Sequence, residues 1–407
     1  MIEPSIPEIQ GFKVAGIHCG LKKEGKLDFA LVVSDRPCVA AGVFTTNLVK
    51  AAPVLVDTDR LSSNAEDIRA LVVNTGCANA CTGRKGIQDA HITARWVAEA
   101  LAVREEQVLV MSTGVIGTHL PMDRMHDGVM MASGALGGDW DTVARAIMTT
   151  DTRPKQASVE VRTADGRVYH VGGVSKGSGM IAPNMATMLA VICTDAMLPQ
   201  AQAQAMLGRA ADVSYNRIVV DGDMSTNDTL VLLANGASGA VLADADLPAF
   251  EQALQQVCVK LAQDIVRDGE GVTKFITLEV SGAPDHEAAR RIANTIATSP
   301  LVKTAFYGGD ANWGRIVAAA GRAGVPLHPE NVRLWIAAGE DRPPTGAGVQ
   351  LFDRGIAAEY DEAKATAIMK EPSIVVRLDC GAGDGLATVW TCDLSHDYVS
   401  INGHYRT

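Results

Sequence analysis

The sequence predicts an α/β protein in which helices cover layers of mixed β-sheet. Three observations indicate this class. Hydrophobic residues make up 47% of the 407 residues but aromatic residues only 4%, so the core must be built from aliphatic side chains. Strand-like and helix-like segments follow one another along the whole chain. Their order is irregular, which favours mixed sheets over the parallel sheet of a strict strand–helix alternation.

The first strands are predicted from short apolar runs that are rich in β-branched residues. Each run ends in residues that favour turns, as strands typically do. Four such runs lie in the first third of the chain, at residues 27–35, 52–58, 68–76 and 107–114. We therefore expect four early strands.

Helices are predicted where apolar residues recur three or four positions apart. The segments with this pattern are residues 87–103, 140–150, 247–269 and 285–299. An aspartate near the start of a helix can accept hydrogen bonds from its unpaired first-turn amides. Asp139 or Asp141 is placed to cap the second of these helices, and Asp246 the third.

The remaining strands come with turn signals. Residues 157–177 read as a hairpin around Asp165-Gly166, and residues 188–195 read as a buried strand. Another strand is predicted at residues 273–282. Two final strands, at 373–381 and 386–395, are predicted to close the chain as a second hairpin with a glycine-rich tip.

Charge and composition exclude several classes of function. The net charge is −11, without a basic stripe or a long run of like charges, which argues against nucleic acid or anionic membranes as partners. The first residues lack the pattern of a secretory signal, and no apolar run approaches the roughly 18 residues that span a bilayer. The eight cysteines are scattered, so we expect a cytoplasmic protein with reduced thiols.

Several segments resemble ligand-binding motifs but lack residues that those motifs require. Residues 172–179 lack the Gly-Lys-Ser/Thr ending of a phosphate-binding loop. Residues 221–232 resemble a calcium loop, but Thr226 and Leu232 stand where that loop requires glycine and glutamate. Neither the cysteines nor the histidines have the spacing of metal ligands. We therefore predict no metal site.

The segment Lys176–Ala196, "KGSGMIAPNMATMLAVICTDA", joins a glycine loop to an apolar strand with Thr187 at the junction. A threonine hydroxyl becomes a nucleophile when a base takes its proton. If the peptide bond before Thr187 is cut, its own α-amine, with a pKa near ~8, can be that base. The alternative interpretation is an ordinary strand-entry threonine, since threonine favours strands.

The segment "KGSGMIAPNMATMLA" resembles the processing and nucleophile segment of the glutamate N-acetyltransferase (ornithine acetyltransferase) family. Other motifs are similar to that family in the same order along the chain. They are "STGVIG", "TTD", "DGDMSTND", "DGEGVTK", "NWGR" and the C-terminal "INGHYRT". The resemblance covers about residues 11–407. Ala311, where many relatives have proline, and Gly403-His404 depart from the pattern.

The resemblance implies roles for individual residues. Thr187 is the expected nucleophile, and the chain is expected to cleave itself between Ala186 and Thr187. Thr113 and Gly114 match the oxyanion-hole pair, a hydroxyl and an N–H aimed at the developing negative charge. The expected substrate-binding residues are Thr150, Lys176, Thr187, Glu270, Asn402 and Thr407.

The resemblance also implies the reaction and the assembly. Acetyl is expected to pass from N-acetylornithine to Thr187 and then to glutamate, without a cofactor or metal; acetyl-CoA is a possible second acetyl donor. An α chain (1–186) and a β chain (187–407) are expected to stay interleaved in a sandwich of the self-processing aminopeptidase/acetyltransferase type, assembled as α2β2. The alternatives are a self-processing aminopeptidase or amidohydrolase, and an uncleaved binding protein.

Overall fold

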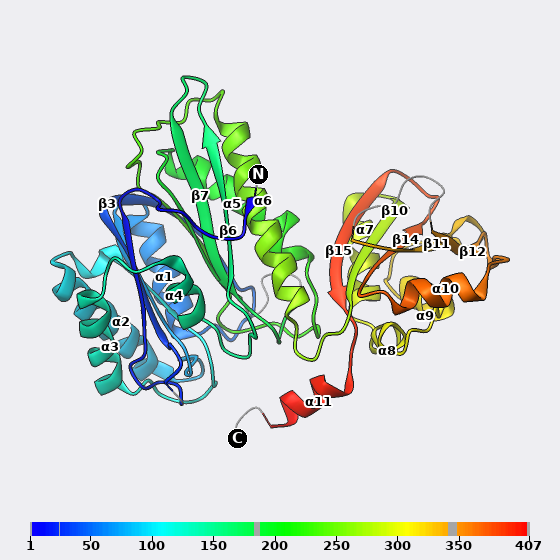
Figure 1. Cartoon of the computed structure of the whole chain (residues 1–407), viewed down its shortest axis with the longest axis horizontal. Coiled ribbons are helices and arrows are strands. Elements are labelled where there is room, and N and C mark those ends of the chain that lie inside the picture. The colour runs from blue at the N-terminus through cyan, green and yellow to red at the C-terminus, as the bar shows by residue number, and fades with distance from the viewer. Residues whose placement is uncertain (1, 24, 183–187, 341–347, 405–407) are drawn as a thin grey trace. The chain divides into compact units, whose positions relative to one another are not determined.

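The computed structural model describes residues 2–23, 25–182, 188–340 and 348–404. The chain divides into two compact units. The first unit comprises the residues up to Asn216 together with Asp223–Ile265, and the second comprises Arg217–Gly222 and the residues from Val266 onward. Each unit contains one mixed β-sheet with its own helices (Figure 1).

The first unit is built on a nine-stranded sheet in the order β1-β6-β7-β8-β9-β3-β4-β5, with β2 beside β3. The pairs β8–β9 and β4–β5 are parallel and the others are antiparallel. The strands are β1 (Ile2–Glu3), β2 (Phe12–Ile17), β3 (Phe29–Phe44), β4 (Ile68–Asn74), β5 (Val108–Ser112), β6 (Lys155–Arg162), β7 (Val168–Lys176), β8 (Leu189–Thr194) and β9 (Thr229–Ala234).

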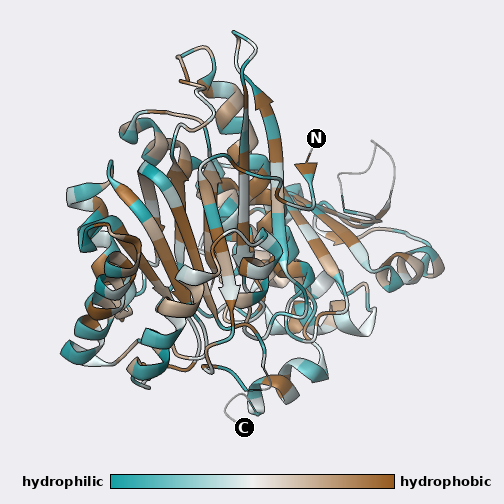
Figure 2. Cartoon of the chain, turned by 60° about the vertical axis from the view of Figure 1, so that its left-hand side comes forward, coloured by the Kyte–Doolittle hydropathy of each residue, from teal (hydrophilic) through white to brown (hydrophobic). Residues whose placement is uncertain are grey.

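The long strand β3 joins two lobes of this sheet. Its first part pairs with β2 and β4, its last part pairs with β9, and its register shifts between Val33 and Cys38. One buried cluster contains alternate residues of both lobes, such as Val32 and Leu71 from one and Val191 and Val231 from the other. The two lobes therefore face each other across a shared aliphatic core, and their strands carry long hydrophobic stretches (Figure 2).

The described residues of the first unit also form the α-helices α1 (Ala52–Asn64), α2 (Gly83–Leu101), α3 (Met122–Gly134), α4 (Trp140–Ala146), α5 (Gln200–Val213) and α6 (Leu247–Arg267). A second buried cluster packs α2 and α3 on the outer face of the lobe that contains β2, β4 and β5. On the other lobe, α5 packs on β3 and β9. These layers confirm the predicted α/β class with mixed sheets.

The second unit is built on a six-stranded mixed sheet in the order β13-β12-β11-β14-β10-β15. Its strands are β10 (Phe275–Ala283), β11 (Arg333–Ala338), β12 (Val349–Asp353), β13 (Ile356–Ala357), β14 (Ser373–Asp379) and β15 (Gly385–Cys392). Its helices are α7 (His286–Ala297), α8 (Pro300–Gly308), α9 (Trp313–Gly321), α10 (Glu362–Lys370) and α11 (His396–Gly403). A single core cluster holds the sheet to α7, α8, α9 and α10.

The predicted strand at residues 52–58 is wrong, because this segment is the start of helix α1. Val54, Asp57 and Arg60, three residues apart, are all buried, whereas Leu55 is exposed. This is the spacing of one helix face, and Pro53 is tolerated because it lies in the first turn. A short apolar run does not separate helix from strand by itself.

The predicted C-terminal hairpin is also wrong. Strands β14 and β15 do not pair with each other, because β10 lies between them, parallel to β14 and antiparallel to β15. The glycine-rich connection instead crosses the end of β10, where Cys380 and Ala382 donate backbone hydrogen bonds to Ser281 and Gly282. The hairpin predicted around Asp165-Gly166 is confirmed as β6 and β7.

The helix predicted over 140–150 begins as expected and ends early, at Ala146. Asp139 caps it by accepting a hydrogen bond from the Thr142 N–H. Asp246 uses its carboxylate differently, accepting from the backbone N–H groups of Ala164 and Ala243. It therefore ties the β6–β7 turn to the loop before α6, and its backbone carbonyl accepts the hydrogen bond from Phe250.

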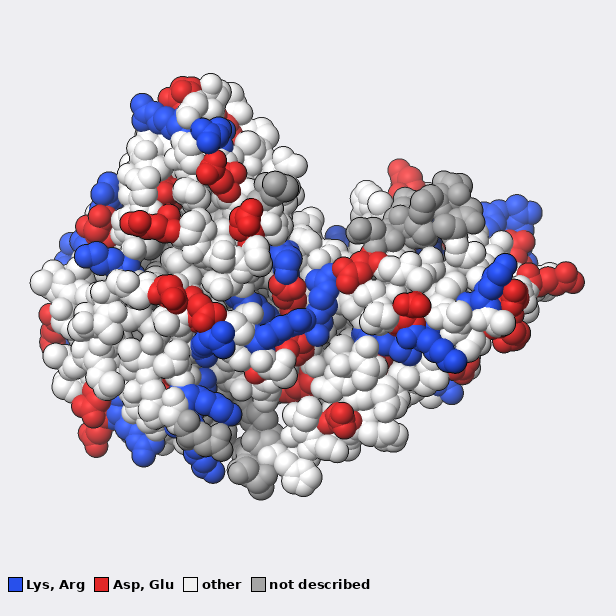
Figure 3. All heavy atoms as spheres, viewed as in Figure 1, with Lys and Arg blue, Asp and Glu red and all other residues white. Residues whose placement is uncertain are grey.

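The surface shows mixed charge. On the face seen in Figure 3, acidic and basic side chains are interspersed over both units. None of the helices in the described part of the chain combines the length and apolarity needed to cross a membrane. All eight cysteines lie within the described ranges and are free thiols.

Candidate active site

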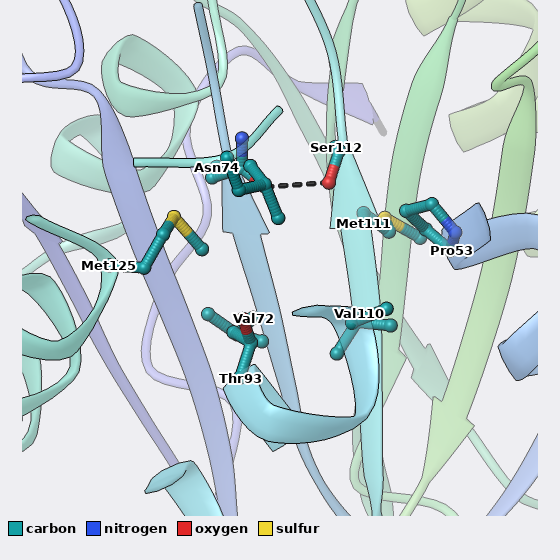
Figure 4. A pocket seen from close by; sticks show the side chains of 10 residues that line it. Pro53, Val72, Asn74, Thr93, Val110, Met111, Ser112 and Met125 are labelled. Carbon is teal, nitrogen blue, oxygen red and sulfur yellow. Dashed lines mark hydrogen bonds between the residues drawn. The ribbon is translucent and has the colours of Figure 1, made fainter. Parts of the chain in front are cut away.

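The end of β5 is held firmly by its neighbour β4. The Ser112 hydroxyl donates to Asn74 Oδ1 at 2.6 Å, as drawn in Figure 4, and the backbone N–H of Thr113 donates to the Asn74 carbonyl at 3.0 Å. Both Ser112 and Thr113 are buried. The chain therefore leaves the sheet at Thr113 in a defined direction.

Gly114 makes the turn that follows. Its φ is +135°, a conformation that residues with a side chain rarely adopt. A Cβ at this position would lie 2.3 Å from the carbonyl carbon of Gly76. Glycine is thus required for the close approach of this turn to residues 76–77.

Lys176, the last residue of β7, reaches Thr113. Its Nζ donates to Thr113 Oγ1 at 3.2 Å, and both residues are almost fully buried, at 2% and 4% exposure. The lysine donates to the threonine oxygen, so the hydroxyl proton can be given to another acceptor. The sequence prediction that singled out Thr113, Gly114 and Lys176 thus falls on residues that the fold brings together.

A buried ion pair lies next to this contact. Asp151 Oδ1 accepts from Lys155 Nζ at 2.6 Å and from the Gly177 N–H at 2.8 Å, and Oδ2 accepts from the Thr149 N–H at 2.9 Å. Burial by itself would raise the pKa of Asp151, but the charges of Lys155 and Lys176 and these hydrogen bonds lower it to about 2. The carboxylate thus anchors both the 149–151 loop and the start of the glycine loop.

Lys22 adds a further cation to this region. Its Nζ donates to the Leu27 carbonyl at 2.7 Å. Burial lowers the pKa of Lys22 to about 8, with Lys176 acting in the same direction and Asp28 and Asp151 opposing it. Lys22 and Lys176 are therefore close enough to influence each other, with the carboxylates of Asp28 and Asp151 acting against them.

Two predicted substrate-binding residues of the second unit also lie together. Asn402 Nδ2 donates to Glu270 Oε2 at 2.7 Å, and Glu270 is 8% exposed. Helix α11, which carries Asn402, is capped by Ser395. The Ser395 hydroxyl also donates to the Gly271 carbonyl at 2.6 Å, which holds the Glu270–Gly271 turn against this helix.

Of the other predicted site residues, the structure describes only Thr150. Thr150 is half-buried in the loop between α4 and β6, directly before Asp151. Thr187, Ala186 and Thr407 lie outside the described residues. Met188, which follows Thr187 in the chain, is described and is 1% exposed.

Two hollows lie near these motifs. The first, shown in Figure 4 below the Asn74–Ser112 hydrogen bond, measures about 10 Å³, which is room for one water at most. The second, about 450 Å³, belongs to the second unit and is lined by residues 308–314 of the "NWGR" turn with Tyr360, Glu362 and Thr366. The first hollow is too small for an amino-acid substrate, whereas the second has the size of a small-ligand site.

Sequence reasoning gave no role to four buried polar residues of this region: Asp151, Lys155, Asn227 and Asp228. Asp151 belongs to the "TTD" motif, and Asn227 and Asp228 belong to "DGDMSTND". No signal for them is present in the sequence, because these segments are polar and their side chains could equally lie in solvent. Lys155 lies only four residues from Asp151, whereas Asn227 and Asp228 bond to residues 78, 112 and 188, which are distant in sequence.

The hydroxyl of Thr113 and the glycine turn after β5 lie beside a buried cation at the end of β7. Such groups polarise a carbonyl, so the site has the composition of an acyl-transfer site. The ArgJ family model matches residues 13–407. The chain belongs to the ArgJ family, and the predicted glutamate N-acetyltransferase (ornithine acetyltransferase) resemblance is confirmed.

Relatives match over nearly their whole length. An arginine biosynthesis bifunctional protein ArgJ of Geobacter sulfurreducens is 47% identical, over 98% of this chain and 100% of that protein. A protein of the same description from Thermotoga neapolitana is 46% identical, over 98% of this chain and 99% of that protein. A crystal structure of an ornithine acetyltransferase complexed with ornithine, from Mycobacterium tuberculosis, is 43% identical and covers 45% of this chain and 97% of that chain, with a TM-score of 0.42.

Proposed function

We propose that this chain is an acetyltransferase of arginine biosynthesis that moves the acetyl group of N2-acetyl-L-ornithine to L-glutamate. The observation that carries the proposal is the buried Lys176–Thr113 contact beside Gly114 in a chain of the ArgJ family. This contact supports an oxyanion hole at the end of β5. Thr187, the residue before Met188 and β8, is the proposed nucleophile.

The proposed mechanism begins with cleavage of the chain between Ala186 and Thr187. The Thr187 hydroxyl attacks the Ala186 carbonyl, the peptide bond gives way to an ester, and water hydrolyses that ester. The products are the carboxylate of Ala186 and the free α-amine of Thr187, which becomes the general base. Strands β7 and β8, one on each side of the cleaved bond, are hydrogen-bonded neighbours in one sheet. The two chains therefore stay together after cleavage.

Acetyl transfer then takes two half-reactions. In the first, Thr187 Oγ attacks the acetyl carbonyl, the amide C–N bond breaks, and ornithine leaves with the proton that the α-amine took from the hydroxyl. In the second, the glutamate amine attacks the ester carbonyl, the C–O bond breaks, and the hydroxyl is restored. The Thr113 hydroxyl and the Gly114 N–H stabilise the tetrahedral oxyanion of both steps.

Charged and polar groups hold the substrates. Lys176 supplies a positive charge suited to a carboxylate, and Glu270 a negative charge suited to the side-chain ammonium of ornithine. Asn402, hydrogen-bonded to Glu270, orients that carboxylate. Thr150 and Thr407 are further proposed contacts by family position. The proposed assembly is α2β2, in the cytoplasm.

A second activity is proposed on a separate observation. The relatives from Geobacter sulfurreducens and Thermotoga neapolitana are both described as bifunctional. The second reaction proposed here is acetylation of glutamate with acetyl-CoA as the donor, through the same acetyl-Thr187. Incubation of the enzyme with acetyl-CoA and glutamate, without acetylornithine, should release free thiol at a steady rate. If no thiol is released, the proposal of this second activity is refuted.

The test of the main proposal is intact mass spectrometry of the denatured protein before and after brief exposure to N-acetylornithine. The expected result is two chains divided at Ala186–Thr187, with one acetyl group gained on the 187–407 chain. Addition of glutamate should remove that acetyl group faster than water does. A single unmodified chain would refute the proposal, and an acetyl group lost equally fast without glutamate would indicate a hydrolase.

Replacement of Thr113 by alanine should slow acetylation of Thr187 by about 10²- to 10³-fold, because one oxyanion donor is lost. The fold should persist, since the Thr113 backbone N–H still bonds to Asn74. Stopped-flow or quenched-flow measurement of acetyl-enzyme formation checks this. Thr75→Ala, a buried threonine just after β4, is the matched control, and an acetylation rate unchanged in Thr113→Ala would contradict the oxyanion role.

A further inference from the structure

The segment before β9 lies against the start of β8. The Asp228 carboxylate, which is 0% exposed, accepts a hydrogen bond from the Met188 N–H at 2.9 Å. One residue on, the Thr229 N–H donates to the Met188 carbonyl at 3.2 Å. Both polar groups of the Met188 backbone are thereby held, so the chain enters β8 from a fixed point.

The neighbouring side chain reaches a different strand. Asn227 Nδ2 donates to the Ser112 carbonyl at 2.8 Å and to the Ala78 carbonyl at 2.7 Å. Asn227 Oδ1 accepts from the Thr226 hydroxyl at 2.7 Å. The Asn227 amide group thus bonds to Ser112, the last residue of β5, which directly precedes Thr113. The hydrogen bond from Thr226 fixes the orientation of this amide group.

These two adjacent residues connect segments that are far apart in the sequence. Asn227 holds residue 112, next to the proposed oxyanion hole, and Asp228 holds residue 188, next to the proposed nucleophile. A loop that only satisfied its own buried polar groups could do so with local partners. Asn227 and Asp228 instead connect β5 to β8. The residues that take part in the proposed reaction lie at the ends of these two strands.

We propose that Asn227 and Asp228 are positioning residues that set the distance between the oxyanion hole at Thr113 and the nucleophile segment that begins β8. This inference rests on the proposed function. Neither residue is expected to touch the substrate. Displacement of a catalytic group by about 1 Å can cost about 10²-fold in rate, so loss of either clamp should act on the chemical step rather than on binding.

The state of Asp228 makes a conservative replacement informative. Burial raises the pKa of Asp228 well above its usual range, against the opposing effects of the Met188 N–H, Lys176 and the hydroxyls of Thr45 and Ser225. Asparagine has nearly the shape of aspartate and also accepts a hydrogen bond through Oδ1. Asp228→Asn should therefore keep the bond from Met188.

The experiment measures the rate of Thr187 acetylation, kcat and KM in purified full-length variants. Asn227→Ala removes one clamp, and Asp228→Leu keeps the shape of aspartate without the acceptor. The matched controls are Asn235→Ala and Asp195→Leu. Asn235 and Asp195 are equally buried and also bond to the backbone, but they lie at the far ends of β9 and β8. Thermal unfolding followed by circular dichroism gives the folded fraction of each variant, and each measured rate is divided by that fraction.

We expect Asn227→Ala and Asp228→Leu to lower the acetylation rate and kcat by about 10²-fold with KM within about threefold. Folded protein that stays uncleaved also supports the clamp, because cleavage uses the same hydroxyl. Asp228→Asn, which is expected to fold normally, should acetylate within about threefold of the wild-type rate, and the two controls should be unchanged per folded molecule.

Three results would overturn the inference while the proposed function stands. The first is a normal acetylation rate in Asn227→Ala and Asp228→Leu, and the second is an equal loss in the controls. A loss in Asp228→Asn as large as in Asp228→Leu would also contradict the clamp, since the hydrogen bond would then not be what matters. A wild-type chain that is neither cleaved nor acetylated would refute both this inference and the proposed function.

Discussion

Thr187→Ala is expected to leave the chain uncleaved and to lower acetyl transfer on the order of 10⁶-fold, the loss typical of removing a catalytic nucleophile. One hydroxyl carries out both reactions in the proposed mechanism, so both should disappear together. Gel electrophoresis under denaturing conditions reports cleavage, and radiolabelled acetyl transfer from acetylornithine to glutamate reports turnover.

Two companion variants make that result interpretable. Thr187→Ser keeps the hydroxyl and, after cleavage, the α-amine, so it should retain part of both activities. Thr194→Ala removes a buried threonine from the other end of β8 and should change stability without abolishing either activity. A cleaved and fully active Thr187→Ala protein would refute the assignment of the nucleophile.

Asp151→Ala is expected to destabilise the protein by about 3–5 kcal/mol. The change removes the partner of Lys155, whose side chain is 1% exposed and whose Nζ lies 2.6 Å from the carboxylate, and leaves that charge buried without its counter-ion. It also leaves the Gly177 and Thr149 N–H groups without their acceptor. Urea unfolding followed by circular dichroism measures the change in free energy.

The matched variants are Lys155→Met and Asp151→Ala/Lys155→Met. Removal of both charges should recover part of the loss, because the buried ammonium is then absent. Recovery should be incomplete, since two backbone N–H groups still lack an acceptor. A change within about 0.5 kcal/mol for Asp151→Ala alone would show that the pair contributes no stability.

The same carboxylate predicts a dependence on pH. The pKa of Asp151 is lowered from 3.8 to about 2, so the ionised form stabilises the fold above pH 3.8 and that contribution falls as the pH drops from 3.8 toward 2. The full contribution is about 2 kcal/mol, of which about 1 kcal/mol is lost by about pH 3. Asp151→Asn should show a correspondingly shallower loss of stability between about pH 5 and pH 3.

Most elements were predictable because their patterns are local. Strand β8 follows from the unbroken apolar run after residue 187, and every residue of β8 is buried. Helix α7 follows from the spacing of its apolar residues, and in the structure Asp285 caps it by accepting from the Ala288 N–H. Helix α1 was missed because Val54, Leu55 and Val56 are consecutive apolar residues, and only the burial of Asp57 and Arg60 reveals the helical face.

The candidate site was predictable in part. Thr113, Gly114 and Lys176 stand in motifs that resemble a known family, and the fold brings Lys176 into contact with Thr113. Glu270 and Asn402 were likewise predicted separately and are hydrogen-bonded. Asp151 and Asp228 were not predicted. Lys155 is only four residues from Asp151, but nothing in the sequence shows that this pair is buried, and the partner of Asp228 lies 40 residues away.

The sequence by itself determined the family, the α/β class with mixed sheets, most of the elements and the motif residues, because periodicity, turn residues and motif order are properties of the chain alone. Only the tertiary structure decided that β10 separates β14 from β15, that Lys176 donates to Thr113, and that Asn227 and Asp228 bond to residues 112 and 188. These contacts join residues 40 to more than 100 positions apart, where packing rather than local propensity sets the partners.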